Sequence, residues 1–329
     1  RTQSRRAGVP VVIAPWHEQA WAQFVSARGA NRLAHGMAIT APGDFFKLDL
    51  SRAIGTALLC RSPLANGEAC GSCRDCVLLA SGTHPDWIVV SPEDSAYIKI
   101  DQIRETSARL AQRPQIAARQ VVLLFPADRM NTAAANALLK TLEEPTPDSY
   151  LILCSERHER LPATIRSRCQ AIAVKPLFDE RWPAALAARA SVSIDAARTA
   201  LVLAGNDPEV ALAIASPEEL GARANVAKSL LSLARGQIEP ATVMASAGRE
   251  VGTWLDRFAA LLRLSMRDVP LSSPFAEFSD LTSRLEMSRL FALQREQGRV
   301  RTLLGSGLRE DLMLYELCCQ WREAARGIN

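Results

Sequence analysis

Four cysteines that lie within one short segment are the residues of this sequence best suited to bind a metal ion. Cys60, Cys70, Cys73 and Cys76 follow the spacing C-x9-C-x2-C-x2-C. Structural zinc prefers four thiolates in tetrahedral geometry, and the C-x2-C spacing lets two sulfurs face one ion from a single turn. Four thiolates leave no coordination position for water. The pattern therefore predicts a closed, structural zinc site in a module near residues 60–76.

The cluster has other interpretations, and the sequence leaves them open. The four thiols could stay reduced and free of metal, or Cys73 and Cys76 could form a redox pair. An iron–sulfur cluster is a further alternative, although no electron-transfer partner is evident around it. A zinc-bearing hook for nucleic acid is the last, and Arg74 is the only basic residue between Cys70 and Cys76.

The remaining cysteines argue against a disulfide framework. They are scattered, and the two adjacent ones would form only a strained bridge; the four are Cys154, Cys169, Cys318 and Cys319. The sequence shows no secretory signal, so the clustered cysteines indicate metal binding in a reducing compartment. We therefore expect a cytoplasmic protein.

A second candidate for chemistry is a degenerate phosphate-binding loop. Such a loop reads G-x-x-x-x-G-K-[ST], in which glycines let backbone N–H groups cradle phosphates and the hydroxyl binds Mg²⁺. Residues 41–48 read APGDFFKL, so Gly43 and Lys47 are present but the second glycine is missing and Leu48 replaces Ser or Thr. Asp44 would place a negative charge beside the phosphates. We expect no bound ATP at this loop.

The acidic pair that hydrolysis also requires is missing. One carboxylate should hold Mg²⁺ and another should polarise water at the end of a central strand. The apolar run Val121–Leu124 is followed by Phe125 and Pro126, neither of which can bind Mg²⁺. Asp128 lies further on, in the loop. The sequence therefore predicts a chain that is not an ATPase by itself.

The elements that must position these residues follow from the apolar pattern. Continuous apolar runs between helical segments predict a buried parallel sheet with strands at 36–40, 86–90, 120–125, 150–154 and 171–174. Asp101 is the expected N-cap of a helix over 102–112. Asn131 or Thr132 caps a second helix over 133–144, which Pro145 ends.

The composition changes after Pro176, where the strand pattern stops. Helical spacing predicts only helices there, over 195–204, 209–215, 217–235, 250–267, 280–298 and 300–325. We predict three domains: an α/β domain over 1–177 with the inserted zinc module, a small helical domain over 178–217 and a larger helical domain over 218–329. The fold class is therefore α/β followed by all-α.

Length and composition fit this division and exclude a membrane protein. The 329 residues are 48% hydrophobic and 22% charged, which is ordinary for a soluble chain of two or three domains. No run of about 18 apolar residues predicts a membrane span. The net charge of +4 permits nucleic-acid contact without arguing for it, because strong binders concentrate more charge on one face.

Two further motifs carry a family resemblance. Residues 136–145, NALLKTLEEP, and residues 161–169, LPATIRSRC, resemble the signatures of bacterial clamp-loader subunits, which are AAA+ proteins. With the cysteine cluster and residues 83–86, THPD, the resemblance covers about 36–176. The delta-prime type in that family keeps the zinc module and the Ser-Arg-Cys motif but lacks the phosphate loop and the acidic pair, as this sequence does.

The resemblance implies a fold, a role and partners. It implies an AAA+ parallel-sheet domain, a helical lid domain and a helical collar domain that mediates oligomerisation. The implied role is that of a rigid stator in the DNA polymerase III clamp loader, which loads the sliding clamp onto primed DNA. The implied partners are the gamma/tau ATPase subunits, the delta subunit, primer–template DNA and, indirectly, the sliding clamp.

The resemblance also assigns Arg168 as an arginine finger that acts in trans on ATP bound by the adjacent ATPase subunit. A guanidinium stays charged and donates bidentate hydrogen bonds to phosphate. An ion pair between Arg168 and a carboxylate of its own domain is the alternative. Arg160 and Arg166 are nearby candidates for the same role.

Contact with DNA is expected at one helix, if at all. Arg104, Arg109 and Arg113 fall on the helix predicted near 102–112, and the last two are i,i+4 neighbours. A solvated basic face is the alternative to phosphate contact. Three hypotheses for the whole chain follow: an assembly subunit of a clamp loader, an ATPase with an unusual loop, and a freestanding zinc-dependent DNA-binding protein.

Overall fold

The computed structural model describes residues 13–41, 45–155, 157–175, 179–248, 250–266, 271–306 and 309–326. The chain forms two compact units, Arg1–Asp179 and Glu180–Asn329. The predicted division at residue 217 into a lid and a collar stays a prediction. None of the described helices is both long enough and apolar enough to cross a membrane.

The first unit is built on a parallel sheet of five strands. They are β1 (Gly36–Thr40), β2 (Trp87–Val90), β3 (Gln120–Leu124), β4 (Ser149–Cys154) and β5 (Gln170–Ala173). The strand order is β2-β3-β4-β1-β5, and every described pair is parallel. The predicted strands are confirmed to within one residue at either end. Parallel strands need crossovers, which the helices between them supply.

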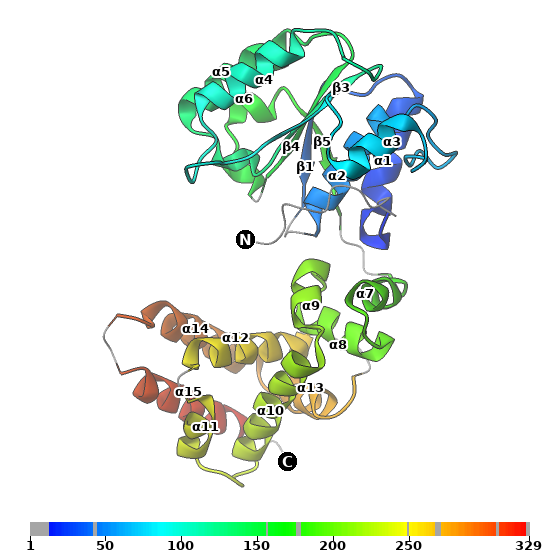
Figure 1. Ribbon diagram of the computed structural model, residues 1–329. Coiled ribbons are helices and arrows are strands. Elements are labelled where there is room, and N and C mark those ends of the chain that lie inside the picture. The colour runs from blue at the N-terminus through cyan, green and yellow to red at the C-terminus, as the bar shows by residue number, and fades with distance from the viewer. Residues whose placement is uncertain are drawn as a thin grey trace. The chain divides into compact units, whose positions relative to one another are not determined.

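Helices cover both faces of the sheet (Figure 1). They are η1 (Pro15–His17), α1 (Glu18–Gly29), α2 (Lys47–Leu59), α3 (Arg74–Ser81), α4 (Ile100–Leu110), η2 (Ala127–Arg129), α5 (Thr132–Glu143), η3 (His158–Arg160) and α6 (Ala163–Arg166). Helices α1, α2 and α3 lie on one side, and α4, α5 and α6 lie on the other.

The central strands are buried on both faces, as the continuous apolar runs predicted. Alternate residues of a strand point to opposite faces. Val122 and Leu124 of β3 belong to the core beneath α4 and α5. Val121 and Leu123 point to the other face and are also fully buried. Every β3 residue therefore has a side chain inside, which explains the absence of polar alternation.

Helix α4 departs from its prediction at both ends. Its N-cap is Lys99 and not Asp101, because the Gln102 side chain accepts a hydrogen bond from the Lys99 N–H at 2.9 Å and the helix starts at Ile100. It ends at Leu110, since Pro114 disfavours helical backbone before it. Arg113 therefore lies beyond the helix. Helix α5 is capped by Asn131, one of the two caps that the sequence allowed, and Thr132 is its first residue.

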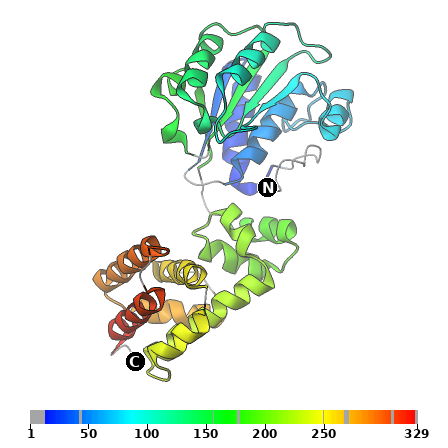
Figure 2. The same cartoon turned by 60° about the vertical axis from the view of Figure 1, so that its left-hand side comes forward.

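The second unit is entirely helical within the residues that the structure describes, as predicted (Figure 2). Its helices are α7 (Trp182–Ala190), α8 (Ile194–Leu203), α9 (Pro208–Ile214), α10 (Pro217–Ala234), α11 (Pro240–Ala247), α12 (Val251–Leu262), η4 (Arg263–Met266), α13 (Phe275–Ser283), α14 (Met287–Leu303) and α15 (Glu310–Ala325).

Two of the predicted C-terminal helices have the wrong limits. The segment 280–298 is divided between α13 and α14. The prediction missed this division because Leu285, in the intervening turn, is buried and continues the leucine spacing across it. The helix predicted from residue 300 instead belongs partly to α14. Gly305, at φ +79°, lies between α14 and α15. Glycine adopts this left-handed backbone without steric cost, so it suits a helix end.

One close approach between α2 and β2 requires a glycine. A Cβ atom on Gly55 would lie 2.0 Å from Cζ3 of Trp87. Gly55→Ala should therefore lower the free energy of unfolding by about 1–3 kcal/mol, because the indole must shift within a packed core. Gly29→Ala is the control, since its added Cβ meets no atom within 4 Å. Urea unfolding of both variants checks this, and equal stabilities would contradict it.

Candidate functional site

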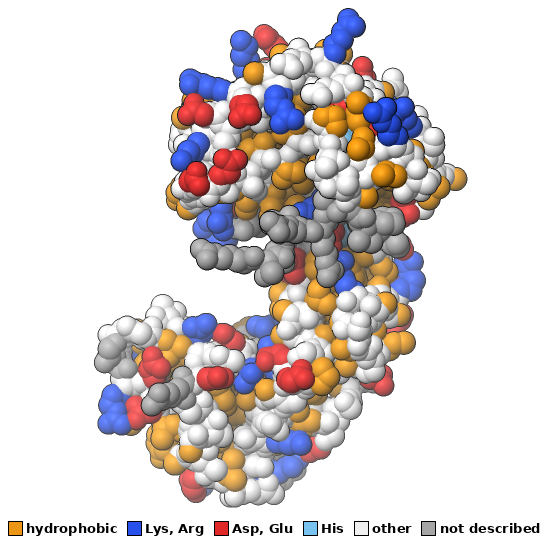
Figure 3. Space-filling model, in the orientation of Figure 1, with side chains coloured by type: hydrophobic (Ala, Val, Ile, Leu, Met, Phe, Trp, Pro, Cys, Tyr) orange, Lys and Arg blue, Asp and Glu red, His pale blue; other side chains and the backbone are white. Residues whose placement is uncertain are grey.

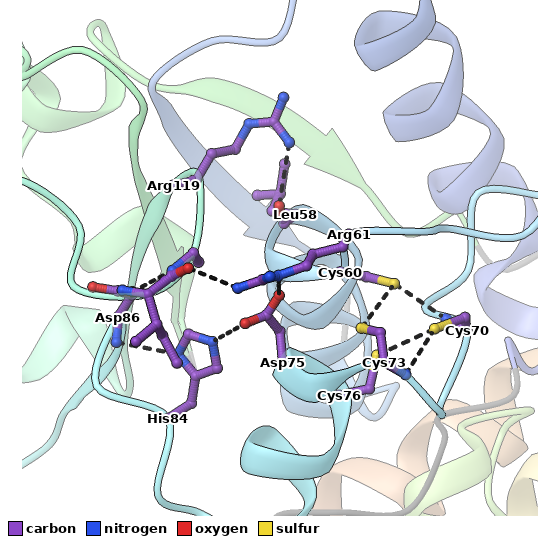
Figure 4. Close-up of polar contacts among 12 residues, drawn as sticks. Leu58, Cys60, Arg61, Cys70, Cys73, Asp75, Cys76, His84, Asp86 and Arg119 are labelled. Atoms are coloured by element: carbon purple, nitrogen blue, oxygen red, sulfur yellow. Dashed lines mark hydrogen bonds and ion pairs between the residues drawn. The ribbon is translucent and has the colours of Figure 1, made fainter.

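The four predicted zinc ligands converge on one point (Figure 4). Cys60 ends α2, Cys73 caps the start of α3, Cys76 lies in the first turn of α3, and Cys70 lies in the loop before it. Their sulfur atoms all lie within 4.8 Å of one another. The Cys60–Cys73 and Cys70–Cys76 sulfur pairs are each 3.9 Å apart.

This spacing fits a tetrahedral metal ion. Zinc–sulfur bonds of about 2.3 Å place tetrahedral sulfurs about 3.8 Å apart. Backbone N–H groups of Cys70 and Cys73 also point at sulfurs, at 3.3 Å from Cys60 Sγ and Cys70 Sγ respectively. Such donors favour thiolates, and hydrogen bonds from Ser72 and Cys73 lower the pKa of Cys70 to about 6. The four cysteines can hold a metal ion, and they are compatible with structural zinc.

Removing the metal should destabilise the first unit. The ligands come from the end of α2, a loop and the start of α3, so a bound ion ties three segments together. We expect a chelator, or Cys73→Ser, to remove bound zinc and lower the melting temperature. Cys169→Ser is the control, because Cys169 lies outside the cluster. Metal analysis with thermal unfolding checks this; a zinc-free chain of unchanged melting temperature would contradict it.

A buried carboxylate joins the cysteine module to the rest of the unit (Figure 4). Asp75 lies between Cys73 and Cys76, and its side chain is fully buried. Its Oδ2 accepts from Arg61 Nε at 2.6 Å, and its Oδ1 lies 3.3 Å from His84 Nε2. Arg61 also donates from Nη2 to the Ile116 carbonyl at 2.8 Å. A buried charge is tolerated when it is paired in this way.

The network continues through the Thr83–Asp86 motif. His84 Nδ1 accepts from the Asp86 N–H at 3.1 Å, so the proton of the neutral ring is on Nε2, which donates to Asp75. The buried Asp86 carboxylate accepts three backbone N–H groups, at 2.7 Å from Gln115 and at 2.9 Å from both Ile116 and Ala117. Asp86 therefore fixes the loop that leads into β3.

Sequence reasoning missed this network. It used residues 83–86 only as part of a resemblance and gave no role to Asp75 or Arg61. The sequence indicated the role of Asp86 only in part. An Asp directly before a strand suggests that its side chain accepts hydrogen bonds from the backbone of a nearby turn or loop. The three N–H groups that donate to Asp86 lie 29 to 31 residues further along the chain, which local spacing does not indicate.

The degenerate phosphate loop carries two buried aromatic residues in the part that the structure describes. Phe45 and Phe46 are 5% and 8% exposed, and the next residue, Lys47, is 2% exposed and starts α2. The rings of Phe46 and Trp16 lie 5.7 Å apart, and His17 Nε2 lies 2.7 Å from the Phe45 carbonyl oxygen. Gly43 lies outside the described residues.

Phe46 occupies the position of the missing second glycine, and its backbone has a left-handed conformation that glycine adopts readily. Its φ and ψ are 51° and 38°, in the left-handed region, and Phe45 also has a positive φ of 46°. Bulky residues rarely adopt this conformation, so surrounding packing must hold it. Both Phe45 and Phe46 are bulky residues, whereas the glycines of a phosphate-binding loop leave room for a phosphate at the backbone.

The end of β3 carries no carboxylate at the two positions directly after it. Phe125 and Pro126 follow Leu124, and the Phe125 N–H donates to the Val90 carbonyl at 3.0 Å, which extends the sheet pairing. Asp128 lies in η2, where its Oδ2 accepts from the Arg157 N–H at 3.3 Å. Asp128 is therefore engaged in loop structure, away from the strand end.

Arg168 lies in the turn between α6 and β5 and is paired within its own unit. Its Nη2 is 2.6 Å from Glu143 Oε1, and its Nη1 donates to the Thr164 carbonyl at 2.9 Å. Its side chain is still 36% exposed. The ion pair joins the two sequence signatures, because Glu143 belongs to residues 136–145 and Arg168 to residues 161–169. Arg160 and Arg166 are exposed.

The three arginines predicted to contact DNA do not form one helix face. Arg109 donates from Nη2 to the Pro85 carbonyl at 3.2 Å, and Arg104 lies 3.7 Å from Asp101. Arg113 follows the helix end and is exposed. On the face drawn in Figure 3, Lys and Arg side chains are interspersed with Asp and Glu. Contact with DNA stays a prediction.

Comparison with known proteins identifies the family. A family model described as "DNA polymerase III, delta subunit" matches residues 16–178. DNA polymerase III subunit delta′ of Pseudomonas aeruginosa is 44% identical over 158 residues, which cover 48% of this chain and 47% of that protein. The Escherichia coli subunit delta′ is 33% identical over 217 residues, covering 66% of this chain and 65% of that protein.

A solved DNA polymerase III gamma subunit-related protein from Thermotoga maritima covers 92% of this chain and 100% of that chain, at 18% identity and a TM-score of 0.44. The chain spans about half to two thirds of the length of the curated relatives it matches. The matched residues include the cysteine cluster, the Asp86 network and Arg168, and the chain belongs to the family of DNA polymerase III delta′ subunits.

Proposed function

We propose that the chain is a delta′ subunit of a bacterial clamp loader that hydrolyses no ATP itself. In this role it assembles with gamma/tau ATPase subunits and a delta subunit, and it helps to load the sliding clamp onto primed DNA. It acts as a rigid stator and supplies Arg168 to ATP held by the adjacent ATPase subunit. Its zinc is structural.

The observation that carries this proposal is a contrast between the chain's own phosphate loop and the arginine that it could offer to a neighbouring subunit. Phe45 and Phe46 are bulky, buried residues of the loop that would cradle phosphates, and Phe125 stands where a carboxylate would follow β3. Arg168, in contrast, is partly exposed on a turn between α6 and β5. A subunit that lacks a phosphate loop of its own but has a partly exposed guanidinium suits action on a neighbour's nucleotide.

The stator role draws support from the bracing of the first unit. A bound ion would tie α2 to α3, and the chain of contacts from Asp75 through His84 to Asp86 ties α3 to β2 and to the loop before β3. Because the carboxylates and the His84 side chain are buried, these contacts are protected from water and salt. A braced unit can transmit force to a neighbour without deforming.

The test is nucleotide binding and hydrolysis by the purified chain, alone and then with gamma/tau and delta subunits. We expect no binding and no turnover by the chain alone, and DNA-stimulated hydrolysis in the stable mixture. Turnover by the chain alone, after contaminants are excluded, would favour an ATPase with an unusual loop. Tight, steeply salt-dependent DNA binding by the chain alone would favour a freestanding DNA-binding protein.

A further inference from the structure

The residue that holds Arg168 in the free chain is Glu143, the last residue of α5. Its Oε1 lies 2.6 Å from Arg168 Nη2, across a gap of 25 positions in the sequence. The opposite amino group, Nη1, donates to the Thr164 carbonyl and lies 3.4 Å from Ser167 Oγ. The guanidinium is therefore held on both sides by its own unit.

Nη2 of Arg168 has to leave Glu143 before it can reach a phosphate. The Nη2 hydrogens that point at Glu143 are the ones that a second bidentate partner would need. The Glu143 side chain is 50% exposed and that of Arg168 is 36% exposed, so water screens the pair and it is weak. A phosphate group carries more charge than a carboxylate and offers more acceptor oxygens, so it can displace Glu143.

We propose that Glu143 is a competitive latch for Arg168. It keeps the guanidinium folded back on its own unit until a neighbour's nucleotide phosphate competes for it. This inference rests on the proposed function, since it assumes that Arg168 acts in trans. The latch makes engagement of the guanidinium depend on the presence of a phosphate. Each engagement then requires the small free energy that breaks the Arg168–Glu143 ion pair.

The competition predicts a specific kinetic signature. Glu143→Gln keeps the shape of the side chain but removes its charge, so Arg168 is released at a lower cost. In the complete complex with gamma/tau, delta, clamp and primed DNA, the ATP concentration for half-maximal hydrolysis should fall about two- to fivefold, the scale of an exposed ion pair. The rate at saturating ATP should not change, because the engaged state lacks the Glu143 contact.

Glu144 supplies the matched control. It follows Glu143, it is also exposed, and it makes no ion pair within the part of the chain that the structure describes. Glu144→Gln removes the same charge at nearly the same place. A general effect of surface charge on nucleotide or DNA binding would therefore appear equally in Glu144→Gln, whereas a latch effect would not.

Three variants measured together decide the matter: Glu143→Gln, Arg168→Ala and the double variant. If Arg168→Ala lowers hydrolysis, Glu143→Gln shifts only the half-maximal ATP concentration and the double variant matches Arg168→Ala, the latch is supported. If Arg168→Ala lowers hydrolysis but Glu143→Gln matches the wild type or Glu144→Gln, the latch is wrong and the finger stands.

Two other outcomes also overturn the latch. A fall in the saturating rate of Glu143→Gln would mean that Glu143 positions Arg168 for reaction and does not compete with phosphate. Wild-type hydrolysis in Arg168→Ala would remove the trans-acting role itself, and the latch with it. These two results differ in which variant loses activity, so failure of the latch is distinguished from failure of the proposed function.

Discussion

Arg168→Ala should abolish most hydrolysis at the ATP site that the subunit shares with its ATPase neighbour. An arginine finger that stabilises the charge developing in phosphoryl transfer contributes on the order of 10³ in rate. The alanine variant loses this charge and all three donor nitrogens of the guanidinium. Single-turnover hydrolysis in the complete complex, with clamp and primed DNA, measures the effect at one site even when other sites remain active.

The structure provides the controls for this experiment. Arg160 and Arg166 are exposed and lie close in sequence, and alanine at either position removes the same charge from the same region. Arg168→Lys keeps the charge but loses the planar fork, so we expect little recovery of rate. If Arg166→Ala lowers the rate and Arg168→Ala does not, the finger has been assigned to the wrong residue.

Folding will not confound the result. The Arg168–Glu143 pair is half-exposed, and pairs of this kind contribute about 1 kcal/mol or less to stability. The melting temperature of Arg168→Ala should therefore stay close to that of the wild type, and the variant should assemble normally. A loss of rate in an intact complex can then be attributed to the guanidinium.

Asp86→Ala should produce a large loss of stability in the first unit. The Asp86 carboxylate accepts three backbone N–H groups, and Asp86 is 1% exposed. Hydrogen bonds to a charged acceptor are stronger than neutral ones, and donors left unpaired inside cost more again. We expect the free energy of unfolding to fall by on the order of 4 kcal/mol.

Urea unfolding followed by tryptophan fluorescence measures this change, and Trp87 lies next to the site. Asp86→Asn should fall between the wild type and Asp86→Ala, because one carbonyl oxygen can still accept. Asp101→Ala is the control, because the Asp101 side chain is 84% exposed and makes a long ion pair, 3.7 Å from Arg104 Nη1. If Asp86→Ala costs no more than Asp101→Ala, the three hydrogen bonds do not brace the loop.

The sequence predicted those features of the structure that depend on residues close together in the chain. Strand β3 was placed correctly because burial on both faces leaves a continuous apolar run. The four cysteines were grouped correctly because three of them lie within seven positions and their ligand chemistry is specific. The Asn131 cap was found because its side chain bonds only three residues ahead, to Ala134 N–H.

What could not be predicted depends on contacts between distant segments. Nothing in the spacing of Glu143 and Arg168 indicates that two separate signatures meet in one ion pair. The Phe45 carbonyl meets His17 across 28 positions, and Arg61 meets Ile116 across 55. The split of 280–298 into two helices was missed for the opposite reason, since Leu285 in the turn imitates the helical pattern.

The conformation of Phe46, with its buried side chain, implies that this residue contributes to the packing of the first unit. A left-handed backbone costs a non-glycine residue about 1–2 kcal/mol, whereas burying a phenylalanine ring gains about 1.5–3 kcal/mol. The ring therefore at least repays its own strain. The substitution Phe46→Gly would relax the backbone but leave a void beside Trp16. Glycine at this position would thus weaken the packing around Trp16 in the first unit.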